Sequence, residues 1–316
     1  MKIEHLYYFL VIADAKSINK ASQKLFVSQQ HLSRIISNLE NDLNAQLFLR
    51  TSTGITLTEK GAKLKQYAQK IVDSYREMQA YFYLDSLPIQ NRDKQIEGEC
   101  QIVLPFFFSL FLTDFMKRFN EVFPHINLRC FEGRTAYTAE EIHNSEQLYL
   151  FIDTPFQIDT LLNAAPELKS YYIGDTDVAI CVNRSSPLAN KTSITGDDFI
   201  SYLQTGYPQS EWNKYLSPNQ LLFISSNIYQ HLDSVLQNNS VCVVPSYTRA
   251  GIYALYPNIV LLPFKEMVLN PIYIFHSNSH TLTDAEKATI YFIYDYMKKI
   301  EQSEKIELLL TKKLTH

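Results

Sequence analysis

The sequence predicts a protein of mixed fold class, with an N-terminal part built of helices and a C-terminal α/β part. Apolar residues recur at helical spacing in most of the first 82 residues. From Cys100 onward, short apolar runs alternate with helical patterns, which is typical of α/β layers with a largely parallel sheet. The chain has 316 residues, more than one hydrophobic core usually serves, so we expect at least two domains.

The first 25 residues predict two helices. The i, i+3, i+4, i+7 spacing of an amphipathic helix is kept by Leu6, Phe9, Leu10 and Ala13. This spacing argues against reading the apolar start as a secretory signal. Ser17 is a suitable N-cap for a second helix that ends at Leu25, and the small Ala21 would let two helices cross closely.

A longer third helix is predicted from Ser28, its N-cap. Its apolar row comprises Leu32, Ile35, Ile36, Leu39 and Leu43. The opposite face carries Gln, Ser, Arg and His side chains, which can donate and accept hydrogen bonds at base edges in the major groove of DNA. The residues that we expect to contact DNA are Ser28, Gln29, Gln30, His31, Ser33, Arg34 and Ser37. A solvated helix face is the alternative, although such faces are more often rich in Glu and Lys.

A β-hairpin is predicted directly after this helix. Two short β-prone runs, 47–50 and 55–57, flank a glycine-containing turn at 52–54. A hairpin in this place is a wing, and Arg50 and Thr51 would lie where a wing meets the phosphate backbone. Contacts of this kind position a protein on DNA without reading its sequence.

The first 61 residues resemble the winged helix-turn-helix of LysR-type regulators. The segments that match the family's spacing are Ser17–Ser22, Leu25–Gln29, Ser33–Ile35, Leu39–Glu40, Leu43, Leu47–Arg50 and Leu57–Gly61. Three residues depart from the family pattern: Ser22 replaces an alanine, His31 a small residue and Asn44 a glycine. Asparagine tolerates the left-handed backbone that follows a helix, so Asn44 can replace glycine. The resemblance implies that residues 1–61 form a DNA-binding domain.

Residues 62–88 predict a long helix that pairs with a second copy of the chain. An a/d seam is formed by Leu64, Ala68, Ile71, Tyr75, Met78 and Phe82. We expect this coiled coil to form a homodimer, or a homotetramer of two dimers as the resemblance implies; a helix lying on its own domain is the alternative. The helix should end before Pro88, and polar residues 89–95 are the predicted hinge.

The predicted strands of the C-terminal part cover 100–104, 126–131, 148–152, 178–182, 200–203, 221–224 and 241–244, with helices at 109–123 and 284–300. The segments 119–124, 128–133, 186–189 and 241–245 resemble the LysR-family effector domain. The resemblance implies two Rossmann-like lobes, similar to type 2 periplasmic binding proteins, in residues 96–304. Lobe I would comprise 96–170 and 268–304, lobe II 171–267, and residues 305–316 a tail.

By the same resemblance, a small-molecule effector binds between the lobes. The residues expected to contact it are Phe107, Ser109, Thr205, Ser225 and Asn227. Helix starts supply free N–H groups, which favours an effector with a carboxylate, and N-capping is the alternative role of each hydroxyl. The run Phe106–Phe108 indicates an aromatic effector or, alternatively, a buried core.

Charge is divided unevenly along the chain. Residues 1–95 contain 13 Lys and Arg against 9 Asp and Glu, a net charge of +4, whereas the remainder sums to −8 within an overall −4. A mildly basic head on an acidic body fits a module that binds double-stranded DNA, joined to a part that does not touch it.

The four cysteines, Cys100, Cys130, Cys181 and Cys242, lie far apart in apolar stretches, with no CxxC pair. They predict buried thiols of a reducing, cytoplasmic compartment rather than a metal site. A redox-sensing pair of Cys100 and Cys130 on neighbouring strands is the alternative. We expect no metal and no cofactor.

Enzymatic function is not predicted. The sequence lacks the GxGxxG, P-loop, HExxH and GxSxG signatures. His231, Asp233 and Ser234 lie close in sequence, but their spacing on one helix does not form a triad. The apolar run 102–112 is well short of the ~20 residues that span a membrane. We therefore expect a regulator, with a solute-binding module or an effector-independent DNA-binding protein as alternatives.

Overall fold

A computed structural model describes residues 2–25, 28–51, 54–86, 95–133, 137–152, 158, 161, 165, 167–208, 213, 216–265 and 270–314. The chain forms two compact units, an N-terminal one of Met1–Tyr83 and a C-terminal one that contains most residues from Leu84 onward. Each unit has its own core and is described by itself.

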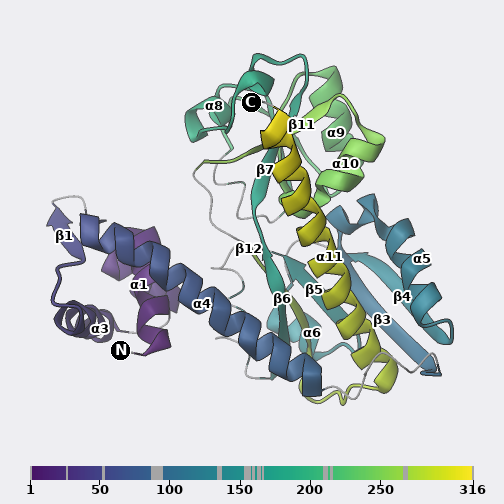
Figure 1. The fold of residues 1–316 in the computed structure, drawn as a ribbon, viewed down its shortest axis with the longest axis horizontal. Coiled ribbons are helices and arrows are strands. Elements are labelled where there is room, and N and C mark those ends of the chain that lie inside the picture. The colour runs from purple at the N-terminus through teal and green to yellow at the C-terminus, as the bar shows by residue number, and fades with distance from the viewer. Residues whose placement is uncertain are drawn as a thin grey trace. The chain divides into compact units, whose positions relative to one another are not determined.

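The N-terminal unit is a helical bundle with a hairpin (Figure 1). Its elements are α1 (Ile3–Ala15), α2 (Ile18–Leu25), α3 (Gln29–Asp42), β1 (Phe48–Thr51), β2 (Gly54–Leu57) and α4 (Glu59–Ser86). Its core includes Leu6, Phe9, Leu10, Ile12, Ala21, Leu32, Ile35, Ile36 and Leu39. The hairpin pairs Phe48 with Leu57 and Thr51 with Gly54. The predicted helices and hairpin are therefore confirmed.

Local hydrogen bonds explain where the first helices begin and end. Ser17 Oγ accepts a bond from the Lys20 amide at 3.3 Å, and Ser28 Oγ accepts one from the His31 amide at 3.2 Å. Both predicted N-caps are confirmed. Asn44 has a φ of +45°, as expected for a residue that replaces glycine after a helix.

The hairpin is fixed to the helices by polar contacts. Glu40 Oε1 accepts hydrogen bonds from the amides of Leu47 at 2.7 Å and Phe48 at 3.3 Å. Gly61, in the first turn of α4, passes so close to the chain that a Cβ there would lie 2.1 Å from the Leu47 carbonyl oxygen. Only glycine fits this approach, so Glu40 and Gly61 set the position of the wing relative to α3 and α4.

The C-terminal unit contains a five-stranded sheet with the order β4-β3-β5-β12-β6. Its strands are β3 (Gly98–Pro105), β4 (Ile126–Gly133), β5 (Leu148–Ile152), β6 (Leu168–Thr176) and β12 (Asn270–Ser277). β3 is parallel to β4 and β5, whereas β12 is antiparallel to β5 and β6. Helices α5 (Leu112–Val122), α6 (Ala139–His143) and α11 (Asp284–Leu314) accompany this sheet, which we call lobe I.

Lobe II is built on a three-stranded antiparallel sheet with the order β10-β7-β11. Its strands are β7 (Val178–Asn183), β10 (Cys242–Pro245) and β11 (Ile259–Pro263), and the parallel pair β8 (Gln204–Gly206) and β9 (Leu221–Ile224) joins it through a bridge from Gln204 to Val241. Its helices are α8 (Gly196–Ile200), α9 (Ile228–Gln237) and α10 (Arg249–Leu255). Short 3-10 turns are η1 (Phe106–Leu110) in lobe I, and η2 (Pro187–Asn190) and η4 (Ser246–Thr248) in lobe II.

The two-lobed α/β fold is confirmed, but the expectation of a largely parallel sheet is wrong. The chain leaves lobe I along β6 and returns along β12, which runs between β5 and β6 and antiparallel to both. The sheets are therefore mixed. The crossing strands β6 and β12 carry several polar residues. These residues interrupt the apolar runs by which strands are predicted from the sequence.

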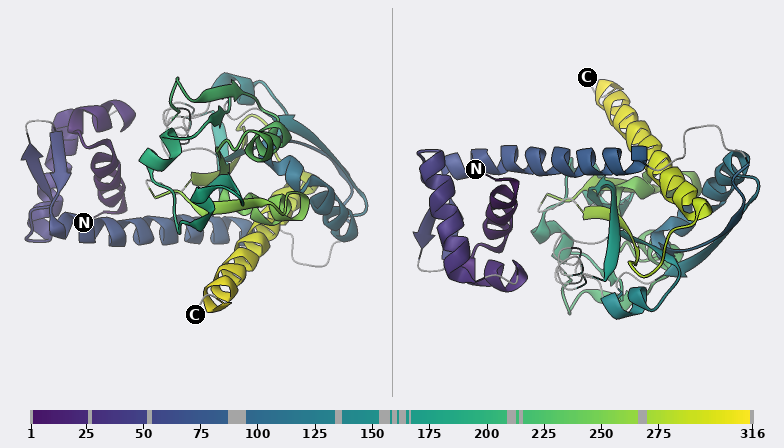
Figure 2. Two further views of the ribbon diagram at one scale, coloured as in Figure 1. Left: turned by 90° about the horizontal axis from the view of Figure 1, so that it is seen from above. Right: turned by 90° about the horizontal axis from the view of Figure 1, so that it is seen from below.

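Three further elements differ from the expectation. The strand predicted at 200–203 is wrong, because Thr195 and Asp198 form a capping box that starts α8 and draws Ile200 into the helix. The helix predicted at 109–123 is divided by Phe111 into η1 and α5. The last helix continues past residue 300 to Leu314, through most of the predicted tail, and Figure 2 shows it as one unbroken helix.

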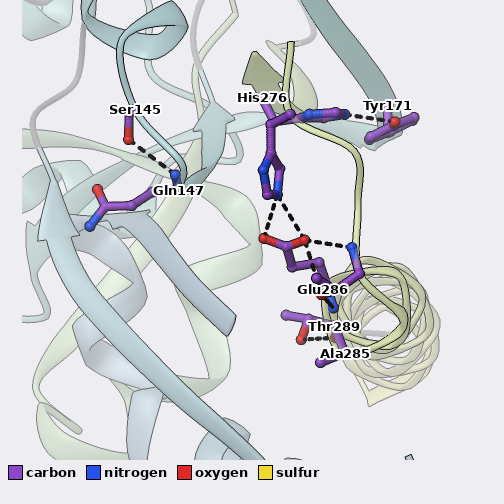
Figure 3. A network of polar contacts seen from close by, with 9 residues as sticks. Ser145, Gln147, Tyr171, His276, Ala285, Glu286 and Thr289 are labelled. Carbon is purple, nitrogen blue, oxygen red and sulfur yellow. Dashed lines mark hydrogen bonds and ion pairs between the residues drawn. The ribbon is translucent and has the colours of Figure 1, made fainter. Parts of the chain in front are cut away.

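A polar network holds the crossing strands to α11 (Figure 3). His276 Nε2 and the Tyr171 hydroxyl form a hydrogen bond of 2.8 Å between β12 and β6. His280 Nε2 lies 2.9 Å from both carboxylate oxygens of Glu286, which also accepts a bond from the Thr283 amide. Burial lowers the pKa of His276 to about 4, so its imidazole is neutral at pH 7.

Candidate DNA-binding surface and effector region

Helix α3 buries its aliphatic face and exposes its polar face. Leu32, Ile35 and Leu39 are buried in the core of the N-terminal unit. On the opposite face Ser28, Gln29, Gln30, His31, Arg34 and Ser37 are exposed, and Ser33 is half-buried. The acidic residues of α3 lie in its last turns, so this face can approach a polyanion without a carboxylate in the way. Leu43, expected in the apolar row, is instead 40% exposed as the residue that ends α3.

Two residues of this face also have structural contacts. The His31 ring meets Tyr8 of α1 edge-on, with centroids 6.3 Å apart, which restrains its orientation while leaving it exposed. Ser28 Oγ accepts the capping hydrogen bond, and this bond does not use the hydroxyl proton. The side chains of Arg50 and Thr51 lie outside the described part of the chain, so their contact with phosphate stays a prediction.

The apolar residues of helix α4 are partly exposed and partly buried in the core of the N-terminal unit. Ile71, Tyr75 and Met78 are exposed, and Phe82 is 64% exposed. Exposed large apolar side chains in a row on one helix indicate a surface that another chain covers. Ala68, by contrast, is 0% exposed within the core of its own unit, and Leu64 packs against that core. Ala68 is thus removed from the predicted seam, because no surface of it is left to contact a second helix.

In the C-terminal unit, an aromatic cluster lies where lobe I meets lobe II. It comprises Phe106, Phe107, Tyr207, Phe223 and His231, which come from η1, β9, α9 and the residue after β8. The Tyr207 ring lies 5.1 Å from each of the Phe106 and Phe107 centroids and 4.4 Å from the His231 centroid. Phe223 lies 5.2 Å from His231 on the other side. The Phe106–Phe108 run is wholly buried, which favours its role as core.

His231 is held by hydrogen bonds at both ring nitrogens. Its Nε2 lies 2.9 Å from the Ser225 carbonyl oxygen, which can only accept, so Nε2 carries the proton. Its Nδ1 lies 2.6 Å from Thr205 Oγ1 and therefore accepts the hydroxyl proton. Burial lowers the pKa of His231 to about 4, which leaves it neutral at pH 7.

The start of α9 is also satisfied internally. Asn227 Oδ1 accepts the Tyr229 amide at 3.0 Å, and Ser225 Oγ donates to Gln230 Oε1 at 2.7 Å. The Tyr229 hydroxyl donates to the Ser109 carbonyl oxygen at 3.3 Å, which joins α9 of lobe II to η1 of lobe I. Ser109 Oγ itself donates to the Phe106 carbonyl oxygen.

The five residues predicted to contact an effector therefore converge on one region. Phe107 and Thr205 are buried, and Ser109 and Ser225 are half-buried, with Asn227 exposed at its edge. Sequence reasoning missed the residues that join them, namely Tyr207, Phe223 and His231. The available signal in the sequence was His231, a histidine among apolar residues of a helix. A buried histidine needs a polar partner, so its position indicated one in the core.

Two other chemistries were searched in the described residues. No group of three or more His, Cys, Asp or Glu side chains there could hold a metal ion. Among the helices of the same residues, none combines the length and apolar character needed to cross a membrane.

Comparisons with known proteins find bacterial helix-turn-helix regulators. The model of the bacterial regulatory helix-turn-helix protein, lysR family, matches residues 3–62. The HTH-type transcriptional regulator YbhD of Escherichia coli (strain K12), itself called uncharacterized, is 27% identical over 213 residues, 67% of this chain and 63% of that protein. GltR of Bacillus subtilis (strain 168) is 29% identical over 189 residues, 60% of this chain and 59% of that protein. The chain thus spans less than two thirds of the length of these two relatives.

Longer alignments extend the similarity to the whole chain. The HTH-type transcriptional regulator BenM of Acinetobacter baylyi (strain ATCC 33305 / BD413 / ADP1) is 24% identical over 318 residues, 95% of this chain and 96% of that protein. The oxidised form of Corynebacterium glutamicum OxyR has a similar fold, with a TM-score of 0.54 at 15% identity over 98% of this chain and 94% of that one. The combination of a winged helix-turn-helix with a two-lobed α/β unit is therefore found in solved structures.

Proposed function

We propose that this chain is a transcription factor of the LysR family of bacterial regulatory helix-turn-helix proteins and that it binds promoter DNA in the cytoplasm. The exposed polar face of α3 carries this proposal. Hydrogen-bonding side chains of Gln29, Gln30 and Arg34 are exposed together, and an α-helix fits the major groove of B-form DNA. Arg34 is the residue suited to a guanine or a phosphate.

The chain acts as a homodimer or a pair of dimers in this proposal. The exposed row of Ile71, Tyr75, Met78 and Phe82 on α4 supports it, since pairing two such rows would cover them. Two copies present two α3 helices, and paired helices of this kind bind half-sites about one turn of DNA apart.

A small-molecule effector at the aromatic cluster is the proposed regulator of DNA binding. Two supports are the meeting of lobes I and II there and the contact of Tyr229 with Ser109 between them. The surrounding rings and the neutral His231 suit an aromatic group. The positive end of the α9 dipole favours a carboxylate, which would have to displace the Asn227 side chain from the Tyr229 amide. A ligand must bind one arrangement of the lobes better than another in order to change DNA affinity.

Mobility shift of the full-length protein on the DNA upstream of its own gene and of the divergent neighbouring gene tests the proposal. We expect sequence-selective binding in the presence of competitor DNA, weakened when salt rises from 50 to 200 mM because bound cations are released from the phosphates. Binding that is equal on scrambled DNA would contradict a base-reading role for α3.

The effector is tested separately by thermal unfolding with three probes: phenylacetate, hexanoate and benzyl alcohol. We expect the aromatic carboxylate to raise the melting temperature more than the aliphatic acid or the neutral aromatic alcohol, because only it matches both the rings and the helix start. Equal shifts, or no shift with selective DNA binding intact, would favour a regulator without inducer control.

A further inference from the structure

Two cysteines lie directly opposite each other in the sheet of lobe II. Cys181 of β7 and Cys242 of β10 are Cα partners in an antiparallel pair. Side chains of directly opposite residues project from the same face of a sheet, with Cα atoms about 4.5 or 5.5 Å apart. A disulfide requires Cα atoms about 4.4–6.8 Å apart, so the register already meets this condition. Both thiols are fully buried and interact with each other.

The other two cysteines provide a contrast within the same molecule. Cys100 and Cys130 do lie on neighbouring strands, β3 and β4, but Cys130 is opposite Ile102 and Cys100 is opposite Leu128. A shift of two residues along a strand, added to the spacing between strands, separates the Cα atoms by about 8 Å. The register of these strands therefore does not favour a disulfide between Cys100 and Cys130, the pair that the sequence suggested as an alternative.

Charged and polar groups flank the Cys181–Cys242 pair. Leu261 of β11 lies opposite Cys181 on the other side of β7, and its carbonyl oxygen accepts a hydrogen bond from Arg249 at 3.3 Å. Arg249 is 9% exposed, and its Nε has no hydrogen-bond partner. Its positive charge lowers the pKa of Cys181, opposing the larger effect of burial, which raises it. A thiolate at Cys181 would thus be stabilised in part by Arg249.

The cysteine pair also contacts the aromatic cluster through Tyr207. Tyr207 interacts with the Cys242 thiol, and its hydroxyl donates to the carbonyl oxygen of Val243, the next residue of β10. The Tyr207 ring also contacts Phe106, Phe107 and His231. Formation of a disulfide between the two sulfurs would therefore alter the packing at the junction of the lobes.

We propose that Cys181 and Cys242 form a dithiol that closes to an intramolecular disulfide under hydrogen peroxide. In the first step the Cys181 sulfur attacks one peroxide oxygen, the O–O bond breaks, and a sulfenic acid and one water form. In the second step the Cys242 sulfur attacks the sulfenic sulfur, an S–S bond forms, and a second water leaves. The two thiols lose two electrons in total, and the peroxide gains them.

Burial determines which oxidant can act and how fast. Both thiols are fully buried, so a small neutral molecule such as hydrogen peroxide has to enter during local opening of lobe II. The raised pKa keeps the thiolate fraction small, and the reaction is accordingly slower than at an exposed cysteine. Once closed, the bond joins β7 to β10 and raises the melting temperature.

Peptide mapping of the full-length wild-type protein tests this directly. The protein is treated with hydrogen peroxide, quenched with catalase, alkylated in denaturant without reductant, digested and analysed by mass spectrometry. We expect a linked peptide containing Cys181 and Cys242, and its loss after treatment with dithiothreitol. Alkylation of both cysteines in full, oxygen addition to them without linkage, or linkage of either to Cys100 or Cys130 would overturn the proposal.

Two matched double variants separate this pair from the other cysteines. Cys100→Ala/Cys130→Ala keeps the proposed pair, and we expect its intact mass to fall by about 2 Da on oxidation, the mass of two hydrogens lost. Cys181→Ala/Cys242→Ala keeps the offset pair, and we expect no such loss. Circular dichroism establishes that both variants fold. The reverse pattern would assign the disulfide to Cys100 and Cys130 and refute the inference.

Discussion

The candidate contact residues are exposed in the N-terminal unit, whereas several of them are buried in the C-terminal unit. On α3 the residues expected to contact DNA are exposed, and on α4 Ile71, Tyr75, Met78 and Phe82 are exposed as well. In the C-terminal unit, Phe107 and Thr205 are buried, and Thr205 is hydrogen-bonded to His231. The candidate contact residues of the N-terminal unit are therefore accessible to a partner without rearrangement, whereas the proposed ligand of the C-terminal unit would have to compete with contacts that already exist. This difference suits a regulator whose DNA affinity is set by its second unit.

The largest expected effect concerns the exposed row of α4. Replacing Ile71 and Met78 together with Asp places carboxylates in the proposed dimer contact, and we expect a loss of more than ~3 kcal/mol in association, because unpaired charges would lose water. Analytical ultracentrifugation should show a monomer. The control Gln66→Asp adds a charge to an exposed position beside the row and should remain dimeric. A dimeric Ile71→Asp/Met78→Asp variant would mean that the dimer forms elsewhere.

Opposite faces of α3 should respond very differently to truncation. Leu32→Ala removes a buried side chain and should lower the free energy of unfolding by about 2–5 kcal/mol. The exposed Gln30→Ala should change it by less than ~0.5 kcal/mol, while weakening DNA binding. Urea unfolding followed by circular dichroism measures both. Similar losses of stability in the two variants would show that the polar face is part of the core.

Acid should destabilise the C-terminal unit over a defined range. The folded pKa of about 4 for His231 and His276 lies below the ordinary ~6.5, so the unfolded chain binds more protons between these values. Stability is full above pH 6.5 and falls as the pH drops toward 4, by at most about 3 kcal/mol for each histidine. Urea midpoints at pH 7.5, 6.5, 5.5 and 5.0 measure this.

A variant assigns part of that pH dependence. Thr205→Val/His231→Phe replaces both hydrogen-bond partners with apolar side chains and removes one titrating group. We expect the slope of stability against pH below 6.5 to decrease by up to ~1.4 kcal/mol per pH unit. An unchanged slope would mean that His231 is not buried neutral in the folded protein.

A smaller loss of stability is expected from removing the Tyr207 hydroxyl. Tyr207→Phe keeps the ring contacts with Phe106 and Phe107 but removes the hydrogen bond to the Val243 carbonyl oxygen. We expect a loss of about 1 kcal/mol in unfolding free energy. Tyr207→Ala, which also removes the ring, serves as the comparison and should cost ~3 kcal/mol or more. Equal losses would indicate that the ring contacts contribute nothing.

The sequence was most informative where structure depends on neighbouring residues. The caps at Ser17 and Ser28, the left-handed Asn44 and the buried row of α3 as far as Leu39 follow from local hydrogen bonding and helical spacing, and each was predicted. The fixed approach of Gly61 to Leu47 was visible only as part of a family pattern, because the clash that requires glycine involves a distant carbonyl.

The missing parts depend on contacts between distant segments. β6 and β12 pair across about a hundred residues, and their polar positions, such as Lys169 and His276, interrupt the apolar pattern. The same reason explains why the offset between Cys100 and Cys130 was not foreseen, since register between strands cannot be deduced from apolar runs. In the candidate effector region, the sequence predicted the hydroxyls at helix starts. It did not predict the rings of Tyr207 and His231, which lie among them.

Loss of selective binding in Arg34→Ala is the most direct test of the central claim, that the exposed face of α3 reads DNA. Affinity for the upstream DNA and for scrambled DNA is measured by mobility shift for the wild type, for Arg34→Ala and for Arg129→Ala, which removes the same charge from an exposed site on β4. We predict that Arg34→Ala loses about 1–3 kcal/mol of binding on the upstream DNA and much less on scrambled DNA, with Arg129→Ala unchanged. Unchanged affinity of Arg34→Ala for the upstream DNA would contradict the assignment of α3 as the DNA-reading helix.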